Sequence, residues 1–86
     1  MKQYSVVYLA EAEDELVSIW ENATDRTLVA EAANTADRLL ASSPEQRSVY
    51  IGEDLWRIDV SLLRFYFAIR EDDRLVEVSN VIVVAN

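Results

Sequence analysis

The apolar positions of the chain change their spacing three times, which divides the sequence into strand-like and helical segments. Residues 3–10 (QYSVVYLA) place Tyr4, Val6 and Tyr8 on one face and predict a first strand. In residues 11–23 the apolar side chains recur at spacings of three and four, which predicts a helix. The apolar stripe of this helix consists of Ala12, Leu16, Ile19, Trp20 and Ala23.

A second helix is predicted over residues 24–44. Thr24 or Asp25 can cap its beginning, and Pro44 ends it because proline cannot continue a helix. Its apolar positions are rich in alanine, which allows a close approach to a neighbouring element. Only a short connection around residues 22–25 separates the two helices, so we expect them to form an antiparallel hairpin.

From residue 46 onward the spacing of apolar side chains becomes two, which predicts strands. One run centres on residues 56–60 and a second on residues 63–70, and a turn at residues 71–74 (EDDR) leads into a third. Residues 42–54 are expected to form a loop. The order strand, two helices, then three strands with a possible fourth predicts a single α+β domain over residues 1–86, with the helix hairpin on one face of a mainly antiparallel sheet.

The polar positions of the predicted strands alternate with the apolar ones and should therefore share the uncovered face of the sheet. This face is the candidate surface for binding a target or a partner. Its members are Arg57, Asp59, Arg64, Tyr66, Glu77 and Ser79.

Composition limits the chemistry that this face can perform. The chain has 86 residues, a net charge of −8, and neither cysteine nor histidine, which removes disulfides, imidazole bases and the usual zinc ligands. The acidity disfavours binding of free nucleic acid. We expect an intracellular, cytoplasmic protein without a membrane segment, a cofactor or a metal.

Four acidic side chains lie at the start of the first predicted helix. Carboxylates at this position are stabilised by the helix dipole, and carboxylates this close in sequence point in different directions around a helix. We therefore interpret the following residues as part of the helix start and not as a metal site: Glu11, Glu13, Asp14 and Glu15.

Three stretches carry a resemblance to a known family: AEDELVSIW, AANTADRLLASSP and LWRIDVSLLRFYFAIREDDRLVEVSNV. In this order they resemble the RelE/ParE superfamily, the toxins of bacterial type II toxin–antitoxin modules, often called plasmid stabilisation proteins. The most specific features are the apolar pattern of the first helix and the Leu-Arg-x-Tyr strand that precedes an acidic turn. The resemblance covers nearly the whole chain.

The resemblance implies one of two activities, ribosome-dependent cleavage of mRNA in RelE-like members or inhibition of DNA gyrase in ParE-like members. Carried over by position, Arg64 matches the arginine that would meet the scissile phosphate, and Arg57 faces the same way from the neighbouring strand. Glu53 or Asp59 could act as the base. RelE-like nucleases usually carry basic residues along the second strand and a basic segment with histidine or tyrosine after the last one, whereas this chain ends in NVIVVAN.

The departures favour a ParE-like toxin that acts by binding its target and is neutralised by a cognate antitoxin. A RelE-like nuclease and a non-toxic, protein-binding relative remain the alternatives. The two arginines also have a purely structural interpretation, as a cross-strand charge ladder with Asp59 and Glu77. Trp20 and Trp56 are interpreted as core residues.

The tail, residues 81–86 (VIVVAN), is apolar on both faces. A strand of this kind is usually covered on both sides, so Val81 and Val83 are candidate partner-binding residues. An antitoxin arm rich in lysine or arginine would cover them and offset the charge of −8. Pairing with a second copy to form a homodimer is the alternative.

Overall fold

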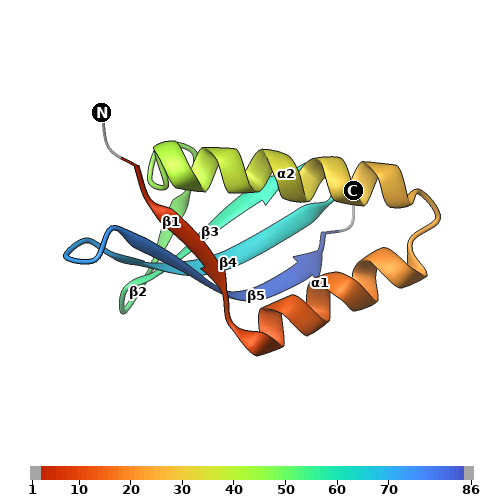
Figure 1. Cartoon of the computed structure of the whole chain (residues 1–86), viewed down its shortest axis with the longest axis horizontal. Helices are drawn as coiled ribbons and strands as arrows, with labels where there is room; N and C mark the ends of the chain where they lie inside the picture. The colour runs from red at the N-terminus through yellow and green to blue at the C-terminus, as the bar shows by residue number, and fades with distance from the viewer. Residues whose placement is uncertain (1–2, 85–86) are drawn as a thin grey trace.

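The computed structural model describes residues 3–84, which form two helices and five strands in one α+β fold (Figure 1). The elements follow the order β1 (Ser5–Tyr8), α1 (Ala10–Asn22), α2 (Arg26–Ser42), β2 (Val49–Gly52), β3 (Leu55–Val60), β4 (Leu63–Arg70) and β5 (Leu75–Val83). The predicted fold class is therefore confirmed. Residues 85 and 86 of the predicted tail lie outside the described residues. No helix in residues 3–84 combines the length and the hydropathy that crossing a membrane requires.

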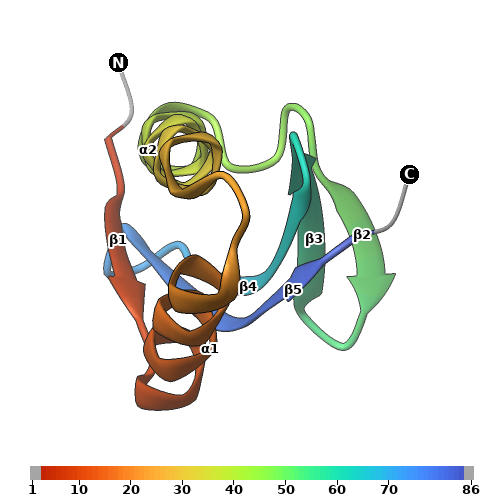
Figure 2. The ribbon, with the colours of Figure 1, turned by 90° about the vertical axis from the view of Figure 1, so that its right-hand side faces the viewer.

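The five strands lie in the order β1-β5-β4-β3-β2. The pairs β2 with β3, β3 with β4 and β4 with β5 are antiparallel, and only β1 pairs with β5 in parallel. Figure 2 shows β1 and β2 at opposite ends of the twisted sheet. The chain's first strand therefore lies beside its last, and the longest strands, β4 and β5, occupy the interior of the sheet.

Hydrogen bonds from side chains fix the end of α1 and the beginning of α2. The carboxylate of Asp25 accepts a hydrogen bond of 3.0 Å from the Leu28 backbone N–H and so caps α2. Arg26 donates to the carbonyl groups of Trp20 and Glu21 at 3.2 and 3.0 Å, which satisfies two acceptors at the end of α1. The predicted cap and hairpin connection are thus correct, with Asp25 as the capping residue.

The core lies between the helices and one face of the sheet. α1 contacts mainly β5, whereas α2 packs against β1, β3 and β4. The two helices supply small or branched side chains, and the strands supply the large ones. The buried core consists of Tyr4, Ala12, Val29, Ala32, Ala36, Leu40, Ile58, Leu63, Phe65, Phe67, Val76, Val78 and Val81.

The interpretation of Trp20 as a core residue is wrong. Its side chain is 42% exposed, and the Arg26 guanidinium lies 4.6 Å from its ring centroid in a cation–π contact. The apolar stripe of α1 is wider than the face it buries, so Trp20 lies at its margin. Trp56 is partly buried and packs against the core, as predicted.

The predicted loop over residues 42–54 contains a strand that the sequence reasoning missed. β2 is short and apolar, so its residues show no alternation of polar and apolar positions. It pairs with β3 through an irregular register between Tyr50 and Gly52, and Gly52 has a φ of 134°, a value that favours glycine. The fifth strand is therefore β2, and the tail simply continues β5.

A β-bulge explains why the alternation of β5 stops. Tyr66 pairs with Asn80 and Phe67 pairs with Val78, which leaves Ser79 as an extra residue in β5. The bulge shifts the pattern by one, so that Val81 follows Val78 onto the buried face. The prediction that Val81 binds a partner is therefore wrong, because its side chain is only 1% exposed.

Candidate functional site

All five charged side chains of the strands gather on the face of the sheet that the helices leave uncovered, called here the open face. The residues are Arg57 and Asp59 on β3, Arg64 and Arg70 on β4, and Glu77 on β5. They alternate with the buried positions of the same strands, which fixes their direction. Three arginines against two carboxylates give this face a formal charge of 3 − 2 = +1 on a chain whose net charge is −8.

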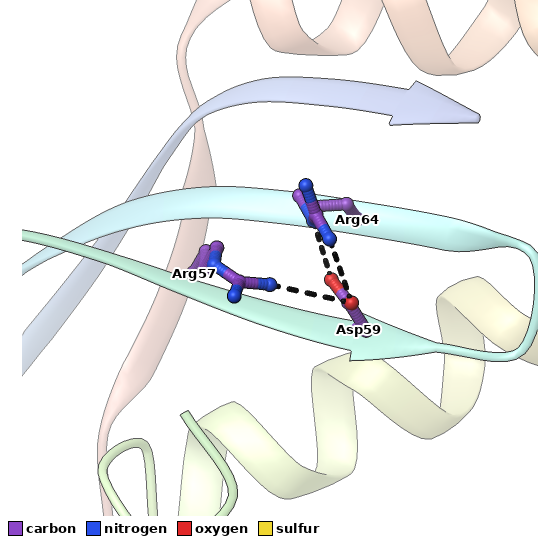
Figure 3. Close-up of polar contacts among 3 residues, drawn as sticks. All are labelled: Arg57, Asp59 and Arg64. Carbon is purple, nitrogen blue, oxygen red and sulfur yellow. Dashed lines mark hydrogen bonds and ion pairs between the residues drawn. The ribbon is translucent and has the colours of Figure 1, made fainter. Parts of the chain in front are cut away.

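Three of these residues form one cluster across β3 and β4 (Figure 3). Asp59 lies directly opposite Arg64 in the antiparallel register. The Arg64 Nε and Nη2 groups donate to the two carboxylate oxygens of Asp59 at 2.7 and 3.0 Å, a bidentate pair. Arg57 Nη1 donates to Asp59 Oδ2 at 3.3 Å. One carboxylate therefore holds both guanidinium groups in place.

Asp59 and Arg64 stabilise each other's charged forms. Hydrogen bonding from Arg64 is the main cause that lowers the pKa of Asp59, and the charge of Arg57 acts in the same direction. The hydrogen bond with Asp59 likewise raises the pKa of Arg64. The cluster carries one net positive charge, and Arg64 keeps unused N–H donors. It can bind an anion, but any anion must approach beside the Asp59 carboxylate.

Tyr66 and Ser79 lie next to the cluster. Tyr66 is the β4 partner of Arg57 in the register, so the two side chains share the open face. Ser79, the bulge residue, donates from its hydroxyl to the Tyr66 carbonyl at 3.3 Å. This hydrogen bond fixes the bulge, and it leaves the Tyr66 ring as the aromatic neighbour of the arginines.

Glu77 does not join the predicted charge ladder with Arg57 and Arg64. It pairs instead with Arg70, whose Nε lies 3.1 Å from Glu77 Oε1. The bulge separates the two clusters, because Glu77 lies before it and faces Ala68. The ladder prediction is therefore correct for Asp59 and wrong for Glu77.

Glu53, the other candidate base, lies away from the cluster. It follows Gly52 in the turn between β2 and β3, with a φ of 52°. Asp59 lies near the opposite end of β3, where it faces Arg64 of β4, and the four steps from Leu55 to Asp59 span about 13 Å at the usual rise of a strand. Glu53 cannot share a reacting group with Arg64 in this arrangement.

Val83, the last partner-binding candidate, is 52% exposed. It lies at the end of β5, where the helix hairpin opens, and lines an apolar groove with Ile19, Leu28 and Leu62. Ile82 beside it points to the open face opposite Arg64 and is 39% exposed. Among residues 81–84, Val81 is therefore buried, while Ile82 and Val83 remain accessible.

The sequence reasoning missed the role of Glu15, which was assigned to the start of the helix. Its Oε1 accepts a hydrogen bond of 2.8 Å from the Val81 backbone N–H, and its two carboxylate oxygens lie 3.4 and 3.3 Å from the Asn80 amide nitrogen. β1 ends before this part of β5, so Glu15 satisfies the edge that β1 leaves unpaired. No group of three acidic side chains in residues 3–84 is arranged to hold a metal ion.

Known proteins resemble the chain in structure although not in sequence. No protein-family model matches the sequence, and no curated protein does. A chain of the toxin–antitoxin complex RelBE2 from Mycobacterium tuberculosis is similar with a TM-score of 0.83 and 16% identity, over 100% of this chain and 97% of that one.

Two further solved structures show the same likeness. A chain of the archaeal RelE–RelB complex from Pyrococcus horikoshii has a TM-score of 0.67 and 15% identity, over 94% of each chain. The isolated Escherichia coli RelE toxin has a TM-score of 0.66 and 16% identity, over 96% of this chain and 86% of that one. The chain therefore has the α+β fold of the RelE toxins, and the resemblance to the RelE/ParE superfamily is confirmed at the level of the fold.

Proposed function

We propose that this chain is the toxin of a type II toxin–antitoxin pair, that it acts in the cytoplasm by binding a cellular target, and that a cognate antitoxin neutralises it. The observation that carries the proposal is the likeness of the whole fold to a chain of a toxin–antitoxin complex, at a TM-score of 0.83. The likeness extends over 100% of this chain and 97% of that one, so it concerns the whole domain and not a part of it.

The open face supports binding of a target over cleavage of RNA. Nucleases of this kind need cations that meet the scissile phosphate and a base within reach. Here Arg64 and Arg57 both donate to Asp59, which lowers the pKa of Asp59 and makes it a weak base. The other candidate base, Glu53, lies at the far end of β3. A site of fixed, partly neutralised charges beside Tyr66 suits a protein surface, where charge pairs set orientation and specificity. DNA gyrase is the candidate target that the ParE-like resemblance implies.

A RelE-like mRNA endonuclease is the second candidate. It is favoured by the structural neighbours, which include the isolated RelE toxin, and by the gathering of Arg57, Arg64 and Tyr66 on one face. The ribosome would then be the target. The cationic face would approach RNA, while the acidic remainder of the chain would stay outside the contact.

The test is induced expression of the full chain in bacteria, with growth and message integrity followed together. We expect growth arrest with intact mRNA, and relief of the arrest by a small partner protein with a basic arm. Arg64→Ala should relieve the arrest, whereas Arg38→Ala, which removes an exposed arginine on α2 that donates a hydrogen bond to Thr35, should not. Inhibition of DNA supercoiling by the purified chain would identify gyrase.

The other outcomes separate the alternatives. Cleaved messages on ribosomes would replace the proposal with the nuclease function. Normal growth, with the chain shown to be folded and present, would leave a non-toxic relative that only binds its partner and would overturn the toxin assignment.

A further inference from the structure

All three ion pairs found within residues 3–84 lie on the open face, so the pairing of arginines is a property of this surface. Arg57 and Arg64 pair with Asp59, and Arg70 pairs with Glu77. The arginines elsewhere in the described part of the chain form no ion pair there, and they are Arg26, Arg38, Arg47 and Arg74. The carboxylates of the open face are therefore placed against its cations.

Asp59 occupies the donors that Arg64 would offer to a phosphate. Arginine binds carboxylate and phosphate oxygens in the same way, through two parallel N–H groups of its planar guanidinium. In Arg64 these groups are on Nε and Nη2, and they donate to the two Asp59 oxygens at 2.7 and 3.0 Å. A phosphate could use this pair of donors only by displacing the carboxylate.

The same carboxylate also holds the second arginine of the cluster. Arg57 Nη1 donates to Asp59 Oδ2 at 3.3 Å, as Figure 3 shows. Hydrogen bonding from Arg64 lowers the pKa of Asp59, so the carboxylate is ionised at pH 7. The side chain of Asp59 is 43% exposed. An anion that arrives from solvent therefore meets a negative charge beside the remaining N–H groups of both arginines.

We propose that Asp59 is a specificity-determining residue of the open face, which excludes the phosphate groups of nucleic acid and restricts this surface to a protein target. A site can select its partner through a repulsive charge that acts against the wrong one. The charge of Asp59 opposes a phosphate, but it can stay paired with Arg57 and Arg64 when a protein surface covers the face. The inference rests on the proposed function, since it concerns how the same surface selects its target.

The experiment compares the full chain with Asp59→Asn in binding a short single-stranded RNA oligonucleotide. Fluorescence anisotropy gives the affinity, and the NMR signals of the arginine side-chain N–H groups locate the contact. Asparagine keeps the size of the side chain and raises the charge of the cluster from 2 − 1 = +1 to +2. We expect binding at low salt to become about fivefold tighter. The logarithm of the affinity should also fall more steeply with the logarithm of the salt concentration, by about 0.7 for each further phosphate contact.

Asp14→Asn is the matched control, because it makes the same change of net charge, from −8 to −8 + 1 = −7, at an exposed position of α1. It should leave the affinity for RNA nearly unchanged. Asp59→Asn combined with Arg64→Gln should lose the gain, because the freed guanidinium is then absent. Thermal unfolding confirms that each variant is folded.

Three outcomes would overturn the proposal. If Asp59→Asn binds RNA no more tightly than Asp14→Asn, the carboxylate is not what excludes phosphate. If the gain survives Arg64→Gln, the RNA binds at another surface. If the natural chain already binds RNA as tightly as Asp59→Asn, Asp59 excludes nothing.

The result can be told apart from the outcome of the growth assay. Growth arrest with intact mRNA, together with no gain in Asp59→Asn, would overturn only the role of Asp59. Cleaved messages would overturn the proposed protein target, whereas a gain in Asp59→Asn would still show that Asp59 repels phosphate.

Discussion

The two faces of the sheet are formed by the same strands but differ in burial and in the kind of side chain they carry. On the covered face, Leu63, Phe65 and Phe67 of β4 are completely enclosed by the helices and by neighbouring strands. On the open face, Arg64 and Tyr66 of the same strand are only partly buried, and their polar neighbours pair with one another. The covered face therefore supplies most of the stability, while the open face can change without loss of the fold.

The strongest test of this division compares Phe65→Ala with Tyr66→Ala. Phe65 is fully buried, so its truncation removes apolar contacts and leaves a cavity, at a cost of about 3–5 kcal/mol in the free energy of unfolding. Its neighbour Tyr66 should cost about 1 kcal/mol or less, as a cross-strand contact does. Urea unfolding of both variants measures the two values. Equal losses would show that the open face is also part of the folding core.

The buried residues of the covered face could be predicted from the sequence, because apolar side chains recur at the period of the strand or helix that buries them. The alternation of β3 and β4 and the helical stripe of α2 each identified their buried residues. The wrong predictions concern segments in which the spacing of apolar residues does not indicate the buried face. β2 is apolar at each of its first three positions, and the bulge at Ser79 reverses the alternation without a proline or glycine to mark it.

The second prediction concerns Glu15, which lies on α1 and accepts a hydrogen bond from the part of β5 that β1 leaves unpaired. Glu15→Ala leaves the Val81 N–H without its acceptor and should cost about 1–3 kcal/mol, the usual penalty for a donor left unsatisfied inside a protein. Glu13→Ala on the exposed first turn is the control and should cost much less. Thermal unfolding compares the two, and equal effects would mean that Glu15 acts only through the helix dipole.

The candidate site was only partly predictable for a related reason. Strand alternation correctly placed Arg57, Asp59 and Arg64 on one face. The partner of each charged side chain depends on the register between the strands, and the one-residue bulge in β5 alters that register. Glu77 therefore pairs with Arg70 instead. The position of Glu53 depends on where β2 ends, and β2 was not predicted.

Tyr8 gives a pH-dependent test of the covered side. Burial, with a hydrogen bond of 2.8 Å to Asp37, raises the pKa of Tyr8 above its ordinary value. The folded state therefore holds this proton more tightly than the unfolded state. The resulting stability is present below the unfolded pKa of about 10 and is lost as the pH rises toward the folded value.

Tyr8→Phe should consequently cost about 1–2 kcal/mol at pH 7, because the hydroxyl donates to a carboxylate in a partly buried position. The difference between the variant and the natural chain should shrink as the pH rises above about 10. Urea unfolding of both proteins at pH 7 and at a pH above 10 measures this difference. A difference that stays constant with pH would mean that the hydroxyl contributes nothing through its proton.

The smallest expected effect lies on the open face, in the pair formed by Arg64 and Asp59. The Asp59 side chain is 43% exposed, so a double-mutant cycle with Asp59→Asn and Arg64→Gln should give a coupling of only about 0.2–1 kcal/mol at pH 7. The pKa of Asp59 is lowered in the folded chain, so this coupling is present above the unfolded pKa of about 3.9 and is lost as the pH falls through the folded value. Unfolding measured at pH 7 and pH 3 checks both statements. A coupling well above 2 kcal/mol that salt does not change would mean that the pair stabilises the fold, as the covered face does. A small coupling, together with loss of toxicity in Arg64→Ala, would mean that the pair serves recognition of the target.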